Sequence, residues 1–153
     1  MSAKLSRHIL QAHGSGAVPR IDPARCFFQL QYGRSKIHRW GIFAAEPIPA
    51  RRRVIEYTGE RVSAEELERR LVRKHLYLFW VTDHYGVDGA FGGSGAEFIN
   101  HCCQPNMYSY VGRGQIFLTT LRRIEAGEEL TYKYNLGDGT PCRCGAKRCR
   151  GTM

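Results

Sequence analysis

Asn100-His101-Cys102-Cys103-Gln104-Pro105-Asn106 lies in the second half of this sequence, and Cys142-Arg143-Cys144 with Cys149 lies near its end. The C-x-C-x4-C cluster supplies three thiolates, whereas a structural zinc site takes four ligands. Cys103 is the best source of the fourth thiolate, so a metal would hold the end of the chain against its centre. The run from Gly127 to Tyr134, GEELTYKY, lies between the two cysteine groups and would be drawn into the same region.

Length and composition indicate one globular domain. Of 153 residues, 42% are hydrophobic, which suits a chain that buries roughly two-thirds of its unfolded surface. No apolar run approaches the roughly 20 residues that span a bilayer, and residues 1–7 lack a secretory core. We expect an intracellular protein without membrane association, in the cytoplasm or nucleoid of a prokaryote or the nucleus of a eukaryote. In a reducing compartment, six cysteines favour metal over disulfides.

The net charge is strongly positive. The sequence has 23 basic and 14 acidic residues, for a formal charge of +9. This charge suits a nucleic-acid partner, or a protein that accompanies nucleic acid, but solubility alone would also explain it. The basic residues occur in several scattered groups, which indicates a diffuse field rather than an element that reads bases.

Local patterns predict short strands and one clear helix. Ser63-Ala64-Glu65-Glu66 is a capping box, and Leu67 and Leu71 follow as an apolar i, i+4 pair. Gly112-Arg113-Gly114 predicts a hairpin turn. Residues 1–24 are expected to form a flexible leader that carries no site. The predicted strands are residues 26–31, 42–45, 53–58, 77–82, 106–111, 115–121 and 129–134.

These elements predict a mostly β fold with short helices and small sheets. The sequence shows no alternation of strands and helices, which argues against a doubly wound nucleotide-binding domain. It also lacks a P-loop and a G-x-S-x-G nucleophile motif. The aromatic residues of the predicted strands could, taken singly, be ordinary core residues.

Together and in this order, the motifs resemble the SET domain of protein-lysine N-methyltransferases with a post-SET zinc-binding tail. The resemblance runs from about Gln31 to Gly151. It implies a knot-like SET domain over residues 25–135 and a post-SET segment over residues 136–153. The segments that carry it are residues 35–44, 54–60, 77–80, 87–88, 98–106, 127–134 and 141–149.

The resemblance implies methyl transfer from S-adenosylmethionine to a lysine amine, with structural zinc in the tail. The implied substrate is a histone or another basic, nucleic-acid-associated protein, and the product is mono- or dimethyl-lysine because Tyr132 limits the space. The implied catalytic residues are Tyr134, Tyr132 and Tyr57, and the implied channel residues are Tyr57, Phe79 and Tyr132. The implied cofactor residues are His38, Trp40, Gly41, Tyr77, Asn100, His101, Tyr134 and Arg143. The implied zinc ligands are Cys103, Cys142, Cys144 and Cys149.

Four positions depart from the family pattern. Arg39 stands where the family usually has a glycine, so a positive φ there would strain the backbone. Glu97 replaces a usual basic residue, Cys102 a usual serine, and Lys133 a usual aspartate. Two other functions remain open: a SET-like module that binds lysine without methylating it, and a zinc-stabilised basic module that binds nucleic acid.

Overall fold

The structure is a computed structural model that describes residues 19–72, 77–134 and 139–153. Most of the predicted leader, residues 1–18, lies outside the described residues. The part from Pro19 onward contacts the domain, because Pro19 is buried and the N–H of Asp22 donates to the carbonyl of Ser94 at 2.8 Å. No helix within the described residues is long and apolar enough to cross a membrane.

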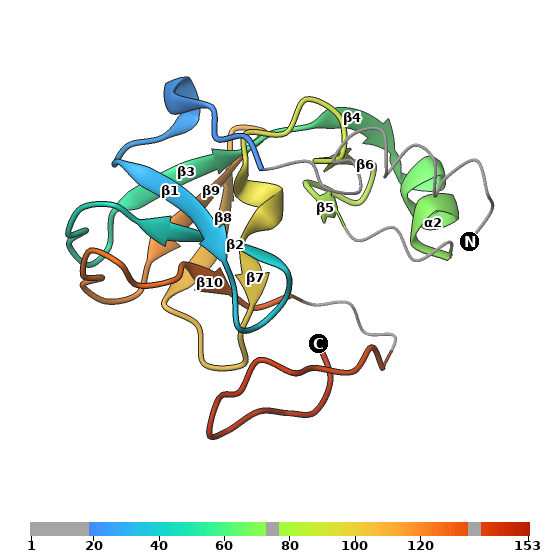
Figure 1. Cartoon of the computed structure of the whole chain (residues 1–153). Coiled ribbons are helices and arrows are strands. Elements are labelled where there is room, and N and C mark those ends of the chain that lie inside the picture. Colours follow the sequence, from blue (N-terminus) through green and yellow to red (C-terminus); the bar gives the residue numbers. More distant parts are fainter. Residues whose placement is uncertain (1–18, 73–76, 135–138) are drawn as a thin grey trace.

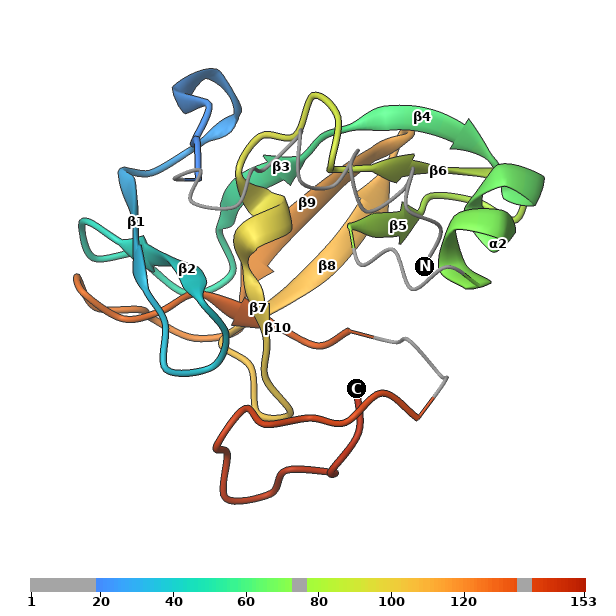
Figure 2. The same cartoon turned by 45° about the vertical axis from the view of Figure 1, so that its right-hand side comes forward.

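Short strands form four small sheets, as the sequence predicted (Figure 1). One sheet pairs β1 (Leu30–Arg34) with β2 (Trp40–Ala44). A second has the order β3 (Arg53–Tyr57), β9 (Gln115–Thr120) and β8 (Met107–Gly112), and a third has the order β4 (Glu60–Ser63), β6 (Tyr85–Asp88) and β5 (Leu78–Trp80). In the fourth, β7 (Asn100–His101) pairs in parallel with β10 (Thr131–Tyr132), next to the first sheet (Figure 2).

The predicted strands agree with the structure in place but not always in extent. The first of them begins later than expected, because Cys26 forms only an isolated bridge to Ile55 and the regular strand starts at Leu30. No sequence pattern predicted β4, β6 or β7. The last two contain polar residues that are buried through tertiary contacts, including Asp88 and Asn100.

A single core joins the first, second and fourth sheets. Its fully buried side chains come from β2, β3, β8 and β9 and from loops that precede β3, β7 and β10. Burial of each such side chain contributes roughly 1.5–3 kcal/mol. They include Ile42, Val54, Ile55, Ile99, Leu118, Ile124 and Leu130.

The predicted helix is confirmed as α2 (Ala64–Val72), which packs beside the third sheet. The hydroxyl of Ser63 accepts a hydrogen bond from the N–H of Glu66 at 3.3 Å and so caps the helix. Leu67 is fully buried, whereas Leu71 is 39% exposed, so the apolar pair is buried at one position only. An ion pair between Arg70 and the fully buried Asp88 of β6, 2.5 Å apart, also fixes the helix.

The predicted hairpin is confirmed between β8 and β9. Gly112 pairs with Gln115, which leaves Arg113 and Gly114 as a two-residue turn with φ values of 52° and 75°. Two positive φ values are the signature of a type I′ turn, whose twist matches that of the flanking strands.

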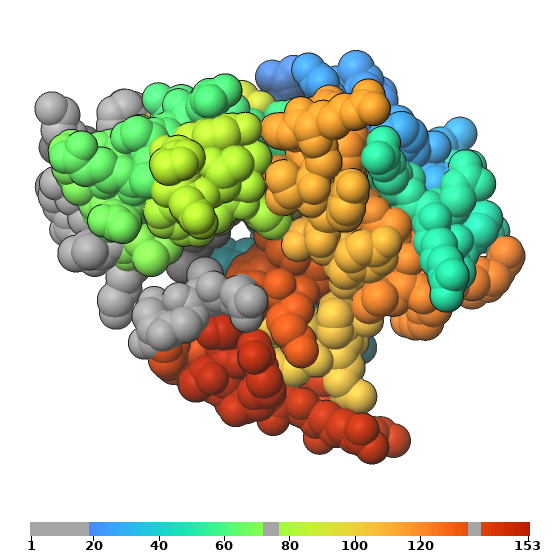
Figure 3. Space-filling model, turned by 180° about the vertical axis from the view of Figure 1, so that it is seen from behind, coloured from blue at the N-terminus to red at the C-terminus, as the bar shows by residue number. Residues whose placement is uncertain are grey.

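The C-terminal segment folds back under the domain (Figure 3). Pro141 and Thr152 form an antiparallel bridge, and the N–H of Cys142 donates to the carbonyl of Gly151 at 2.9 Å. The N–H of Arg148 donates to the side chain of Gln104 at 3.1 Å, which joins this loop to the segment after β7. The two cysteine groups of the sequence therefore meet.

Candidate active site

Four thiols gather where the C-terminal segment meets the centre of the domain. The Sγ atoms of Cys103, Cys142, Cys144 and Cys149 all lie within 4.8 Å of one another. Zinc–sulfur bonds of about 2.3 Å in a tetrahedron place sulfur atoms about 3.8 Å apart. Cys103 Sγ lies 3.7 Å from Cys142 Sγ and 3.9 Å from Cys149 Sγ, so the cluster has the size that tetrahedral zinc requires.

Backbone donors prepare two of these thiols for metal binding. The N–H of Arg150 donates to Cys103 Sγ at 3.3 Å and lowers the pKa of this thiol to about 7. Burial raises the pKa of Cys144, but backbone donors, including the N–H of Cys103, outweigh that effect and hold it at about 6. Both groups are therefore ready to act as thiolates, the form that binds zinc.

His101 connects the thiol cluster to the end of β10. Its Nδ1 accepts a hydrogen bond from the N–H of Tyr134 at 2.8 Å, so a neutral ring carries its proton on Nε2. Nε2 lies 3.2 Å from Cys103 Sγ and donates to the thiolate. The parallel pairing of β7 with β10 brings these groups together, because Tyr132 lies opposite His101 in the register.

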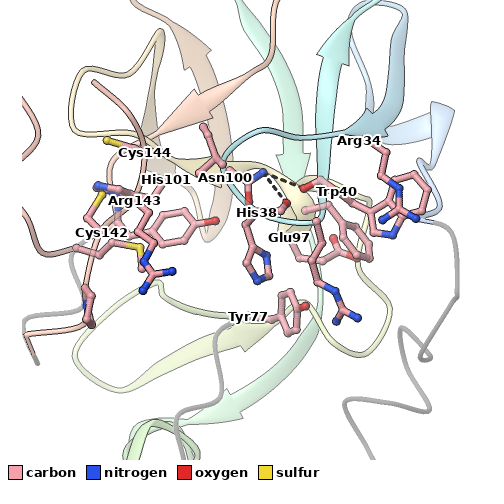
Figure 4. Close-up of a pocket in the computed structure, with 16 residues that line it drawn as sticks. Arg34, His38, Trp40, Tyr77, Glu97, Asn100, His101, Cys142, Arg143 and Cys144 are labelled. Atoms are coloured by element: carbon pink, nitrogen blue, oxygen red, sulfur yellow. Dashed lines mark hydrogen bonds between the residues drawn. The ribbon is translucent and has the colours of Figure 1, made fainter. Parts of the chain in front are cut away.

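A cavity of about 380 Å³ opens beside this junction, within the size range of small-molecule sites. Three parts of the chain supply most of its lining: the loop before β2, the segment leading into β7, and the C-terminal segment (Figure 4). Tyr77, before β5, and Tyr134, after β10, complete it. Its lining contains Arg34, Arg39 and Arg143, which suit a carboxylate, and the aromatic rings of Trp40, Tyr77 and Tyr134.

Asn100 fixes the wall of the cavity. Its side-chain nitrogen donates to the carbonyl of Trp40 at 2.8 Å and also reaches the carbonyl of His38 (Figure 4). It donates to Glu129 Oε1 at 2.9 Å as well. Asn100 is buried, so these bonds are made in a poorly solvated place and hold the loop before β2 firmly.

An aromatic cluster adjoins the cavity at Tyr134. The ring centroids of Tyr134 and Tyr132 are 4.9 Å apart, and Tyr132 in turn lies 6.4 Å from Phe79. Phe79 lies 5.3 Å from Tyr57, whose hydroxyl donates to the carbonyl of Tyr77 at 2.9 Å. Of these four rings, Tyr134 alone also lines the cavity.

The tyrosine hydroxyls in this cluster stay protonated. Burial raises the pKa of Tyr57, Tyr132 and Tyr134 above the ordinary value, and neighbouring negative groups raise it further. The Tyr134 hydroxyl donates to the carbonyl of Ile99, which sets the orientation of its ring. These groups can donate and accept hydrogen bonds, but they do not serve as bases near neutral pH.

Comparison with known proteins identifies the family. The SET domain matches residues 39–135 of this chain, which is more than half of it. The chain belongs to the SET-domain family.

This chain resembles curated proteins over 80% or more of its length. It is 39% identical over 138 residues to "Histone-lysine N-methyltransferase, H3 lysine-4 specific" of Kluyveromyces lactis, covering 80% of this chain and 14% of the relative. It is 38% identical over 165 residues to "Histone-lysine N-methyltransferase set1" of Dictyostelium discoideum, covering 99% and 11%. It is 39% identical over 166 residues to "Histone-lysine N-methyltransferase SETD1A" of Homo sapiens, covering 96% and 10%. The chain thus spans a small part of each relative.

Most residues expected to bind the cofactor of the SET domain line one cavity. They are His38, Trp40, Tyr77, Asn100, His101, Tyr134 and Arg143. Gly41 lies behind the wall: a Cβ at this position would stand 2.4 Å from Glu129 Oε1, so only glycine permits the carboxylate to approach. The expected channel residues Tyr57, Phe79 and Tyr132 form the adjoining cluster.

Glu129 is a positioning residue of the SET domain that no sequence pattern singled out. Its Oε1 accepts from the hydroxyl of Ser35 at 2.7 Å as well as from Asn100, so it ties the loop before β2 to β7. The signal that could have identified Glu129 is its place in the GEEL motif, where a carboxylate directly precedes buried residues. Glu97 was noted only as a departure, yet it is buried and lines the cavity.

Arg39 has the conformation that the sequence analysis anticipated. Its φ is 35°, in the left-handed region that favours glycine. The arginine side chain lines the cavity of the SET domain and leaves its volume open. The departure therefore strains the backbone locally and does not close the site.

Proposed function

We propose that this chain transfers a methyl group from S-adenosylmethionine to the side-chain amine of lysine in a protein. One observation carries the proposal: Tyr134 belongs both to the cavity that would hold the cofactor and to the aromatic cluster that would hold the lysine. A methyl donor and its acceptor must meet in line at such a junction. The names of the relatives, which are histone-lysine N-methyltransferases, support the same activity.

The cavity suits S-adenosylmethionine in size and in chemistry. His38, Trp40, Tyr77, Asn100, His101 and Arg143 would hold it, with Gly41 and Glu129 behind them. When bound, it supplies an electrophilic methyl group carried on a cationic sulfur. The arginines would attract its carboxylate, and the aromatic rings would cover its apolar parts.

The aromatic cluster would prepare the lysine. Tyr57, Phe79 and Tyr132 exclude water, and a dry environment disfavours the charged form of an amine whose ordinary pKa is about 10.4. The Tyr134 hydroxyl, oriented by the carbonyl of Ile99, would align the amine and stabilise the charge that moves with the methyl group. No nucleophile or covalent intermediate is needed.

Zinc in the thiol cluster would complete the cavity. Cys142 and Cys144 are proposed ligands and, with Arg143 between them, also line the cavity. A metal bound there would fix one wall of the cofactor site and not merely the end of the chain.

A histone is the substrate class that we propose, with mono- or dimethyl-lysine as product. The names of the relatives support it, because they are histone-lysine N-methyltransferases and that of Kluyveromyces lactis is specific for lysine 4 of H3. The net charge of +9 supports a role beside nucleic acid through indirect association. In a eukaryotic cell such a substrate implies action in the nucleus.

The test is methyl transfer from labelled S-adenosylmethionine to a panel of histones and other basic proteins. We expect labelled lysine with the wild type. Tyr134→Phe should lower turnover by about tenfold or more, because each 1.36 kcal/mol of transition-state stabilisation is worth tenfold, while cofactor binding stays close to normal. Tyr108→Phe, at an exposed position of β8, is the matched control.

A Tyr134→Phe variant as active as wild type would contradict the assigned role of this hydroxyl. Two further results would favour the other functions. Calorimetric binding of lysine peptide without binding of S-adenosylmethionine would indicate the lysine-binding module instead. Binding of DNA or RNA alone, with neither of these ligands, would indicate the zinc-stabilised nucleic-acid module.

A further inference from the structure

Glu97 is a buried carboxylate in the wall of the cavity that the proposed chemistry has not yet used. It is 8% exposed and lies between Trp40 and Tyr77 in Figure 4. Among the side chains that line the cavity in the described part of the chain, it is the one carboxylate. Arginines from the other segments provide the positive charge. The cavity thus has one side-chain carboxylate in a lining that also carries three arginines.

The loop before β7 holds this carboxylate in place. The N–H of Gly95 donates to Glu97 Oε2 at 2.8 Å. A Cβ at Gly93 would stand 2.3 Å from Glu97 Oε1, so the carboxylate lies directly on the loop backbone. The side chain therefore has a fixed position and does not move freely in the cavity.

Glu97 also lies next to the aromatic cluster, beside Tyr57. A Cβ at Gly89 would lie 2.8 Å from Glu97 Cβ and 2.9 Å from the Tyr57 hydroxyl, which places the two side chains on either side of one glycine. The negative charge of Glu97 helps to raise the pKa of the hydroxyls of Tyr57, Tyr77 and Tyr132. Glu97 thus both lines the cavity and borders the cluster, toward which a transferable methyl group must point if the cluster holds the lysine.

This carboxylate has no cationic partner among the residues that the structure describes. No Lys, Arg or His of the described residues forms an ion pair with Glu97. Burial raises its pKa to about 7, even though the Gly95 N–H and its own N–H act in the opposite direction. A bound cation would favour the ionised form and would gain a strong interaction in this poorly solvated place.

We propose that Glu97 is the counter-charge for the cationic sulfur of S-adenosylmethionine, and that it makes the site prefer this cofactor to its neutral thioether product. The inference rests on the proposed function, because it assumes that this cavity binds the cofactor. The substrate and product forms share the adenosine, the ammonium and the carboxylate. They differ at the sulfur by one methyl group and one positive charge.

The experiment is calorimetric binding of S-adenosylmethionine and S-adenosylhomocysteine to the wild type and to Glu97→Gln. We expect the variant to lose about tenfold or more in affinity for S-adenosylmethionine, the scale of one partly buried charge pair. Its affinity for S-adenosylhomocysteine should change less than about twofold, because no charge is lost there. Glu125→Gln, at the surface, should leave both affinities unchanged.

A second measurement needs no variant. In the wild type, the ratio of the two affinities should favour S-adenosylmethionine more at pH 8 than at pH 6, as Glu97 ionises. The ratio cancels the groups that the two ligands share. The groups that face Glu97 are the hydroxyls of Tyr57, Tyr77 and Tyr132, with Arg39 beyond Tyr77, and their raised pKa values keep the tyrosines neutral over this range.

The outcomes separate the two proposals. Binding of both ligands with the same affinity ratio in wild type and Glu97→Gln would overturn the assignment of Glu97 and leave the methyltransferase proposal standing. Binding of neither ligand by zinc-loaded wild type would contradict the proposed function, and the assignment of Glu97 with it. Zinc content and circular dichroism establish that the variant is folded.

Discussion

At the scale of single residues, Tyr132 and Tyr134 show how position separates neighbouring roles. Both belong to the aromatic cluster, but Tyr134 also lines the cavity, whereas Tyr132 is 8% exposed and faces Phe79. We expect Tyr132→Phe to raise the final methylation state with little loss in the first transfer. The phenylalanine cannot hold a water beside the amine, and in a close-packed channel the space of one methyl group matters. Mass spectrometry of exhaustively treated substrate measures this; abundant trimethyl-lysine from the wild type would contradict it.

Glu97 also predicts a pH dependence of stability. Its pKa is about 7 in the folded protein and near the ordinary 4.5 in the unfolded chain, so the folded state binds the proton more tightly. Stability that depends on Glu97 is therefore present at low pH and is lost as the pH rises from about 4.5 to about 7. Glu97→Gln should be as stable as wild type at pH 4.5 and more stable, by on the order of 3 kcal/mol, at pH 8. Urea unfolding at both pH values tests this, with Glu125→Gln as control; a constant difference would exclude it.

At the scale of elements, the C-terminal segment depends on its four thiols. Few regular hydrogen bonds hold residues 139–153, which contain no helix or named strand. We expect a strong chelator, or Cys144→Ser, to release one zinc per chain and to loosen this segment, since structural zinc contributes directly to folding. Cofactor affinity should fall in parallel, because Cys142 and Cys144 line the cavity.

The control for this prediction is Cys26→Ser. Cys26 is remote in sequence from the four thiols and contacts the carbonyl of Asp22. The Cys26→Ser variant should therefore retain the zinc and the cofactor affinity. Metal analysis and limited proteolysis give the readout. Purified wild type without zinc, or with these thiols paired as disulfides, would contradict the assignment.

At the scale of the whole molecule, the positive charge predicts a dependence on salt. The net charge of +9 should attract the nucleic acid that accompanies a chromatin substrate. Raising the salt concentration should therefore lower methylation of a DNA-bound substrate more than methylation of a free peptide, since screened charges no longer recruit the DNA. Initial rates for both substrates over a salt series measure this. Equal sensitivity would mean that the charge serves solubility.

Several features could be predicted from the sequence because their causes are local. The Ser63 cap of α2 and the Gly112-Arg113-Gly114 turn follow from neighbouring residues, and the structure has both. The thiol set and the aromatic residues could be named through their motifs and spacing, and the structure brings the four thiols together.

Other features arise only from contacts between distant segments. β7 contains two polar residues and becomes a strand because β10, some thirty residues later, pairs with it. Glu129 acts on Ser35 and Asn100 across the fold, and Glu97 becomes a buried charge because the loop before β7 folds over it. The sequence by itself thus determined the fold class and the kinds of groups in the site, since these depend on residue type and spacing. The tertiary structure decided which polar groups lose water and what they face, because desolvation and charge pairing depend on neighbours in space.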